Sequence, residues 1–347
     1  MTMREHRRVW ARLGEVVREF LQSEARWRAT GLAALLLASL LGITGMNVLN
    51  SYVGRNFMSA LAERQTSAFR WYAILYFAVF AASAAVAALE RFLEERLALN
   101  WREWLTGRIL NAYMGGRAYL HLQERGTVDN PDQRIAEDLR AFSATVLSFC
   151  ILLFNGTLTV LSFSVVLWSI SPTLLAVCFG YAAVGSAVTI LLGRPLVGLN
   201  YRQLDREADF RSSLIHVREN ATSIALSGAE APLQRTLADK FAALAENTRA
   251  IIRVNFGLNF ATNGYNYLPQ ILPVLIIGPL YMRGVIEFGV VSQATIAFGQ
   301  LVGALSLLVT QYHAISSFTA AVVRLCELTE AIEGCQQNPI GAVALAK

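Results

Sequence analysis

Long stretches without charged residues alternate along this chain with strongly charged stretches. Residues 29–54 and 141–193 contain no Asp, Glu, Lys or Arg. A helix needs about 20 apolar residues to cross a bilayer, so the first stretch fits one span and the second fits two, divided at Ser171-Pro172. The same reasoning along the whole chain predicts six transmembrane helices. They are expected at about 29–54, 71–89, 141–169, 173–193, 254–282 and 288–312.

Two long charged inserts separate these spans, Glu90 to Arg140 and Arg194 to Arg253. Both keep strong helix formers and an apolar stripe at helical spacing, so each neighbouring span is expected to continue as a helix beyond the membrane. Gly115-Gly116 ends that pattern in the first insert, and Gly228 interrupts it in the second, followed by Pro232. The sequence therefore predicts two long helical hairpins.

The ends of the chain have patterns of their own. Residues 1–28 hold seven arginines with apolar residues between them at near-helical spacing. This indicates an amphipathic helix on the cytoplasmic membrane surface, and a solvated helix in a disordered tail is the alternative. The segment is too charged for a secretory signal peptide. The last span is expected to continue as a helix through Arg324, Glu327, Glu330 and Glu333, and residues 334–347 form a short tail.

Composition places the chain in the membrane class. It is 54% hydrophobic and 16% charged, with a mean hydropathy of +0.42. Of its 30 Lys and Arg residues, four lie in the predicted outer loops, and 26 lie in the termini and the two inserts. This asymmetry predicts that both termini and both hairpins are cytoplasmic, and it explains the net charge of +5 without a nucleic-acid partner. The four outer residues are Arg55, Arg64, Arg70 and Arg283.

The first hairpin carries the segment Asn130-Pro131-Asp132-Gln133-Arg134-Ile135-Ala136-Glu137-Asp138. Asn-Pro favours a turn, and Asp-Gln favours the start of the next helix. The residues alone fit either an ordinary helix-capping turn or a contact that passes force into the membrane helices. The tip of the second hairpin runs from Arg218-Glu219 through Thr222, Leu226 and Ser227 to Gly228-Ala229-Glu230.

The first segment resembles the first cytoplasmic loop of ABC half-transporters of the peroxisomal fatty-acyl type (subfamily D) and their bacterial relatives. The SbmA/BacA peptide-uptake transporters share this membrane domain without an ATPase. The second tip resembles the second loop of the same family, but Thr222 takes an acidic position, Leu226 and Ser227 take aromatic positions, and Ala229 separates Gly228 from Glu230. The resemblance covers residues 29 to about 333.

The resemblance implies an all-α ABC exporter-type membrane domain in the bacterial inner membrane. It implies a homodimer in which spans 4 and 5 reach across to the partner, and alternating-access transport of an amphipathic or hydrophobic solute. Two coupling loops would dock on nucleotide-binding domains, fused or separate, that hold ATP and Mg. The coupling residues it implies are Asn130, Pro131, Asp132, Gln133, Arg134, Glu137 and Asp138 in loop 1, and Arg218, Glu219, Gly228 and Glu230 in loop 2.

No motif of a known catalytic site stands out in the chain. No GxxxxGK[ST] phosphate-binding loop occurs, since Lys is found only at 240 and 347. No catalytic triad, metal-ligand cluster or CxxC pair stands out, so the chain is expected to be a transporter domain rather than an enzyme, with no cofactor or metal of its own. An intramembrane hydrolase is the weakest alternative.

The source of energy stays open at this stage. The predicted spans contain no Asp or Glu, and His313, close to the inner end of the last one, is the one ionisable candidate near a span. Proton coupling generally uses such groups, so their scarcity favours ATP drive over an SbmA/BacA-like proton-driven peptide transporter. A truncated, non-transporting membrane scaffold is the other alternative.

Uncharged amides mark a candidate substrate path. Those of span 5 recur at about one helical turn and those of span 6 lie seven residues apart, so each set shares a face and the two sets can oppose each other. Amides are costly against lipid and should point inward, either to line a path or to join helices by hydrogen bonds. The prolines of span 5 fit either a gating bend or a static kink. The candidates are Asn259, Asn263, Asn266, Gln270, Gln293 and Gln300.

Overall fold

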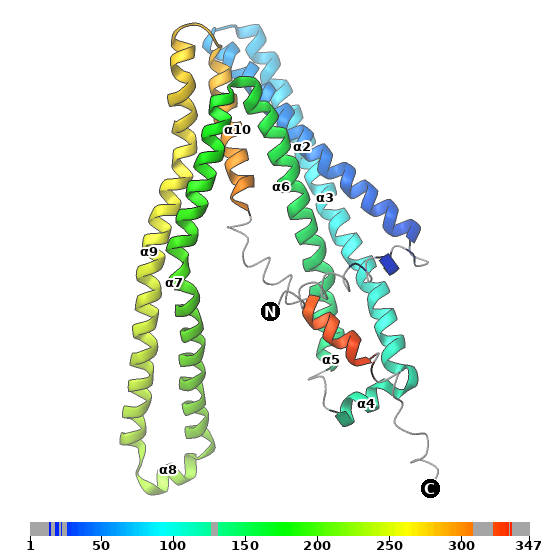
Figure 1. Ribbon diagram of the computed structural model, residues 1–347, viewed down its shortest axis with the longest axis vertical. Helices are drawn as coiled ribbons and strands as arrows, with labels where there is room; N and C mark the ends of the chain where they lie inside the picture. The colour runs from blue at the N-terminus through cyan, green and yellow to red at the C-terminus, as the bar shows by residue number, and fades with distance from the viewer. Residues whose placement is uncertain are drawn as a thin grey trace.

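The computed structural model describes residues 14, 18–20, 22, 26–125, 131–307, 322–332 and 334, and its regular elements there are all helices (Figure 1). The all-α prediction is therefore confirmed over these residues. The elements are α2 (Arg26–Ala62), α3 (Thr66–Met114), η1 (Gly115–Arg117), α4 (Ala118–Arg125), α5 (Pro131–Gln133), the π-helix η2 (Arg134–Asp138), α6 (Leu139–Ile170), α7 (Pro172–Glu219), α8 (Ala221–Ser227), α9 (Glu230–Met282) and α10 (Phe288–Leu305). Residues 322–332 form a further helix, here called the C-terminal helix.

Among the described residues, five helical segments are long and apolar enough to cross a membrane: α2, α3, residues 131–170, α7 and α10. The predicted fifth span, 254–282, lies in α9, which is not one of the five. Its four asparagines, one glutamine and three prolines make this stretch more polar than the others. Six spans therefore remain the prediction from the sequence.

The helices form two arms that diverge from a common end (Figure 1). In one arm α7 packs along α9, and α8 joins them at the far end. In the other arm α3 packs on α6, with α2 alongside and α4 and α5 near the far end. Helix α10 lies where the arms meet and contacts α2, α6, α7 and α9. Its buried side chains, Phe298 and Leu301 among them, form a core with Leu167 of α6 and Leu174 of α7.

The turns follow local sequence rules. Ser171 caps α7, because its Oγ accepts a hydrogen bond from the Leu174 N–H at 3.3 Å, and Pro172 begins the helix. Helix α3 ends at Met114, before Gly115. Gly228 ends α8 in the left-handed region at φ +65°, where a side chain would add strain. The breaks predicted at these three points are confirmed.

The outer end corrects one prediction. Residues 55–70 were expected to form a polar connection, but α2 continues to Ala62 and α3 begins at Thr66. No Gly or Pro interrupts residues 55–62, so the helix extends past the end of its apolar run. Arg55 lies within α2, and its guanidinium approaches the Glu287 carboxylate at 3.7 Å. The Ser59 hydroxyl donates to the same carboxylate at 3.1 Å, so these contacts join α2 to the start of α10.

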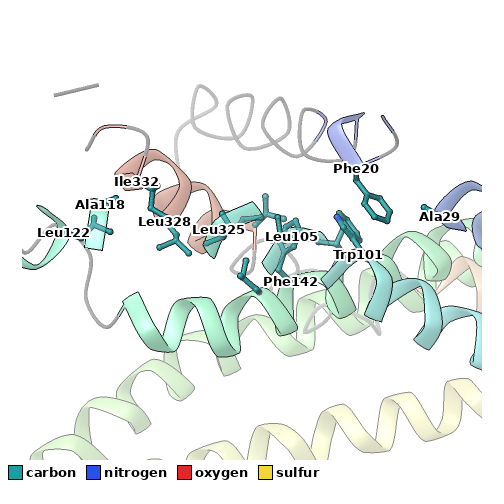
Figure 2. Close-up of a cluster of buried hydrophobic side chains, with 14 residues drawn as sticks. Phe20, Ala29, Trp101, Leu105, Ala118, Leu122, Phe142, Leu325, Leu328 and Ile332 are labelled. Carbon is teal, nitrogen blue, oxygen red and sulfur yellow. The ribbon is translucent and has the colours of Figure 1, made fainter. Parts of the chain in front are cut away.

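A second core lies in the arm of α3 and α6, beyond the apolar stretch of α3 and around the start of α6 (Figure 2). Trp101 packs between Phe20, at a ring-centroid distance of 5.8 Å, and Phe142, at 5.4 Å. Leu325 and Leu328 of the C-terminal helix complete the cluster. This core therefore joins both ends of the chain to the first hairpin. Most of the predicted N-terminal helix (1–28) and the tail (334–347) lie outside the described residues.

Candidate functional site

A pocket of about 470 Å³ lies between α7, α9 and α10 near the junction of the two arms. Its polar groups are hydroxyls and carboxamides, and none of its lining side chains is an acid, a lysine, an arginine or a histidine. Such a pocket has the size and mixed lining of small-molecule sites. The lining residues are Gly185, Ser186, Thr189, Thr262, Tyr265, Asn266, Pro269, Gln270, Thr295, Gly299, Val302, Gly303 and Ser306.

Tyr265 of α9 is held in place from both neighbouring helices. Its ring stacks on Tyr181 of α7 with centroids 4.6 Å apart and planes within 3°. Its hydroxyl lies 3.1 Å from the Ser306 Oγ, just past α10. A Cβ on Gly185 would lie only 1.9 Å from the Tyr265 ring, so a residue without a side chain is needed on α7 at this point. One wall of the pocket thus depends on contacts among three helices.

Pro269 explains a further contact of this wall. A proline lacks the N–H that would bond to the carbonyl four residues earlier, so Pro269 leaves the Tyr265 carbonyl without its helical donor. The Tyr181 hydroxyl donates to this carbonyl. The lost intrahelical bond is therefore replaced by one between α7 and α9. Helix α9 stays helical through Pro269, Pro273 and Pro279, the three prolines of the predicted fifth span.

The amides predicted to form a substrate path divide into two groups. Asn266 and Gln270 line the pocket. Asn259 and Asn263 are exposed on α9 and do not line the pocket, although Asn263 directly follows the lining residue Thr262. Gln300 is exposed on α10 and does not contribute to the lining.

The sequence allowed Gln293 either to face these amides or to join helices, and in the structure it contacts α2. It is 1% exposed, and its Nε2 donates to the Ser51 Oγ of α2 at 3.4 Å. The face of α10 that carries Gln293 packs on α2, whereas Thr295, Gly299 and Val302 face the pocket. Gln293 thus joins two helices, which is the alternative that the sequence left open for these amides.

Sequence reasoning missed Tyr265, Thr262, Thr295 and Ser306 as lining residues. It selected carboxamides and gave no weight to hydroxyls. A Ser or Thr hydroxyl in a helix often donates to a backbone carbonyl of the same helix, so its presence in the sequence does not indicate a binding site. The Thr262 and Thr295 hydroxyls do bond to carbonyls four residues earlier. One indication was available: Pro269, four residues after Tyr265, leaves the Tyr265 carbonyl in need of a hydrogen-bond donor from another helix.

The first hairpin turn is tied to the C-terminal helix. Arg134 donates to Glu327 at 2.9 Å, and Arg324 donates to Asp138 at 3.0 Å, so the pairs run antiparallel along the two segments. Arg134 and Asp138 are half-buried in these contacts. Both residues lie in η2, and π-helical segments are frequent at functional sites.

The other residues of this turn face outward or are not described. Asp132, Gln133 and Glu137 are exposed, and Pro131 is half-buried at the start of α5. Gln133 donates to Glu137 at 3.2 Å. Asn130 lies outside the described residues, as does His313.

All the predicted coupling residues of the second hairpin turn are exposed, namely Arg218, Glu219, Gly228 and Glu230. Leu226 in α8 is 85% exposed, so the tip presents an apolar side chain to its surroundings. The other arm makes no substantial contact with this tip within the described residues (Figure 1). Both hairpin turns thus offer surface at the far ends of the two arms.

Comparison with known proteins agrees with this architecture. The family described as ABC transporter transmembrane region 2 matches residues 17–282. The chain belongs to this family. A helical membrane domain with two long hairpins is consistent with that membership, and the resemblance drawn from the first hairpin turn is confirmed.

Three relatives illustrate the range of the family. The chloroplastic ABC transporter D family member 2 of Arabidopsis thaliana is 37% identical over 95% of this chain and 47% of its own length. An uncharacterized ABC transporter ATP-binding protein of Synechocystis is 35% identical over 90% and 48%. The inner membrane ABC transporter ATP-binding protein YddA of Escherichia coli is 28% identical over 87% and 57%. The chain spans about half the length of these relatives.

Proposed function

We propose that this ABC transporter membrane domain moves a solute by alternating access through the pocket between α7, α9 and α10, with ATP hydrolysed on a nucleotide-binding domain. The observation that carries the proposal is the uncharged, hydrogen-bonding pocket at the junction of two diverging arms. A change in the angle between the arms would open this junction to one side and then the other. Relatives named as ATP-binding transporters support the energy source.

The two hairpin turns are the proposed contacts with the nucleotide-binding domain. They lie at the far ends of the arms, where a push acts with the longest lever on the membrane helices. Asp132 and Gln133 present polar contacts at the first turn, and Leu226 presents an apolar one at the second. The arginine distribution supports cytoplasmic termini, and the resemblance to bacterial transporters supports an inner-membrane location; both belong to the same proposal.

The proposal is tested by the accessibility of the pocket. Thr262→Cys is placed in a background with the native cysteines replaced by serine, in inside-out membrane vesicles that contain the whole gene product. A membrane-impermeant maleimide should label the introduced thiol at one rate in the resting state and at a rate changed severalfold with ATP and vanadate. Phe77→Cys, at an exposed apolar position of α3, is the control and should stay unlabelled in both states.

Two results would overturn parts of the proposal. A labelling rate at residue 262 that ATP and vanadate leave unchanged would argue against ATP-driven alternating access. A rate that responds to an imposed proton gradient instead would favour the proton-driven alternative. The predicted spans contain no Asp or Glu, so we expect no such response.

A further inference from the structure

A second cavity, of about 530 Å³, lies between the start of α2 and the middle of α3. Two arginines from different helices line it, Arg28 of α2 and Arg96 of α3, and both are exposed. The ion pairs on this part of α3 join Arg91 to Glu94 and Glu95. Within the described residues neither Arg28 nor Arg96 pairs with a carboxylate. Glu103 also lines the cavity, so its lining carries one net positive charge.

The cavity lies beside the inner end of span 1 and directly beyond the inner end of span 2, since its α3 residues begin at Phe92. The uncharged run of α2 begins directly after Arg28, and that of α3 ends just before Glu90. The two helices are held side by side here by a small apolar core. Trp27, which also lines the cavity, is 77% exposed, and exposed tryptophans are typical of membrane–water interfaces.

We propose that this cavity binds the phosphate of an anionic phospholipid from the leaflet on the side of the hairpins. Arg28 and Arg96 approach the phosphate from two helices, as arginine does in many phosphate sites. A lipid is favoured over a free phosphate because one side of the cavity is apolar. Leu32 and Phe92 line it, and Phe92 is exposed on the membrane side of Arg96, where an acyl chain would run.

This inference is independent of the transport proposal, because the cavity lies between α2 and α3, whereas the transport pocket lies between α7, α9 and α10. A bound anionic lipid would neutralise two guanidinium groups that have no carboxylate partner among the described residues, and it would brace α2 against α3. It would thereby fix the depth at which the α3–α6 arm leaves the membrane.

Native mass spectrometry of the full chain in detergent tests the proposal. The protein is mixed with phosphatidylglycerol or with phosphatidylcholine of the same acyl chains, and the retained lipid is counted. We expect wild type to retain phosphatidylglycerol preferentially. Arg28→Gln/Arg96→Gln should weaken that binding on the order of 30-fold, since each arginine near an anionic surface is worth about 1 kcal/mol. Arg211→Gln/Arg235→Gln, with the same loss of charge on the α7–α9 arm, should bind as wild type does.

A second variant tests whether the lipid needs the cavity itself or only the positive charge around it. Gly31 lines the cavity, and a Cβ placed on it would meet nothing within 4 Å. Gly31→Leu therefore fills the cavity without removing charge, and it favours the helix over glycine. We expect it to weaken phosphatidylglycerol binding at least tenfold with the circular dichroism unchanged. Wild-type binding by Gly31→Leu would overturn the cavity as the site.

A third measurement identifies the source of the phosphate. Inorganic phosphate at millimolar concentration should displace bound phosphatidylglycerol only weakly, because it gains nothing from the apolar wall. If inorganic phosphate binds wild type and phosphatidylglycerol does not, the lipid proposal is overturned in favour of a soluble anion. Equal retention of both lipids by wild type would overturn it as well.

Discussion

At the scale of single residues, the candidate pocket depends on a backbone carbonyl that its own helix cannot satisfy. Pro269 removes the donor for the Tyr265 carbonyl, and Tyr181 supplies another from α7. Gly185 leaves the space that the Tyr265 ring occupies. Pro269 of α9, Tyr181 of α7 and Gly185, one turn after Tyr181, therefore act together to position Tyr265.

The first prediction concerns this hydrogen bond. Tyr181→Phe should lower thermal stability in detergent by the equivalent of about 1–3 kcal/mol, because a buried carbonyl loses its donor. Pro269→Ala restores a backbone N–H four residues after Tyr265, so in that background Tyr181→Phe should cost clearly less. Tyr267→Phe, at an exposed position of the same helix, is the control. Equal costs of Tyr181→Phe in both backgrounds would contradict the interpretation.

The second prediction concerns the space at Gly185. Gly185→Ala forces the Tyr265 ring to move and should destabilise the protein by about 1–3 kcal/mol. Gly180→Ala and Gly193→Ala, on the same helix with open space at the Cβ position, should be neutral or stabilising by up to about 1 kcal/mol. Thermal unfolding of the three variants checks this, and a loss at Gly185 no larger than at Gly180 would refute the close approach.

At the scale of elements, the first hairpin turn and the C-terminal helix behave as one unit. The apolar core beneath them includes Leu139 and Phe142 of α6 and Leu325 and Leu328 of the C-terminal helix. The pairs Arg134–Glu327 and Arg324–Asp138 run along its edge. A displacement of the turn would therefore be passed to residues 322–332 through these contacts.

The third prediction tests that connection. Arg134→Glu should speed hydrogen exchange of residues 322–332, because it places two acids together at the edge of the core. Exposed pairs are worth only about 0.2–1 kcal/mol, so the effect should be severalfold rather than a loss of structure. Adding Glu327→Arg should restore protection. Asp132→Arg, exposed on the same turn, should leave exchange unchanged, and equal effects of the two single variants would argue against the pairing.

The sequence predicted where helices begin and end better than it predicted which side of each helix packs on which neighbour. Ser171-Pro172, Gly115 and Gly228 mark the turns because their backbone preferences are local. Which helix a given face packs against depends on residues far away in the sequence. Gln293 could have faced α9, but packing places it against Ser51, 242 residues away. Tyr181 and Tyr265 meet across 84 residues for the same reason.

At the scale of the whole molecule, the α7–α9 arm leaves apolar surface without cover from the rest of the described chain. Tyr201 is 68% exposed and Leu204 is 66% exposed, three residues apart on α7 and beyond its apolar stretch. Large side chains at such positions in water favour an interface. A homodimer in which this arm packs on the partner would cover them, and we propose that assembly.

The last prediction follows from that proposal. Tyr201→Ser/Leu204→Ser should weaken dimerisation at least tenfold, since burying a large apolar side chain contributes about 1.5–3 kcal/mol. Fluorescence energy transfer between labelled copies, diluted in liposomes, measures the affinity. Leu226→Ser removes a leucine that is even more exposed, but at the tip of the arm in α8, where the nucleotide-binding domain is proposed to dock, so it should leave dimerisation unchanged. A monomeric wild type would refute the assembly, and a dimer weakened equally by both variants would place the interface at the tip of the arm instead.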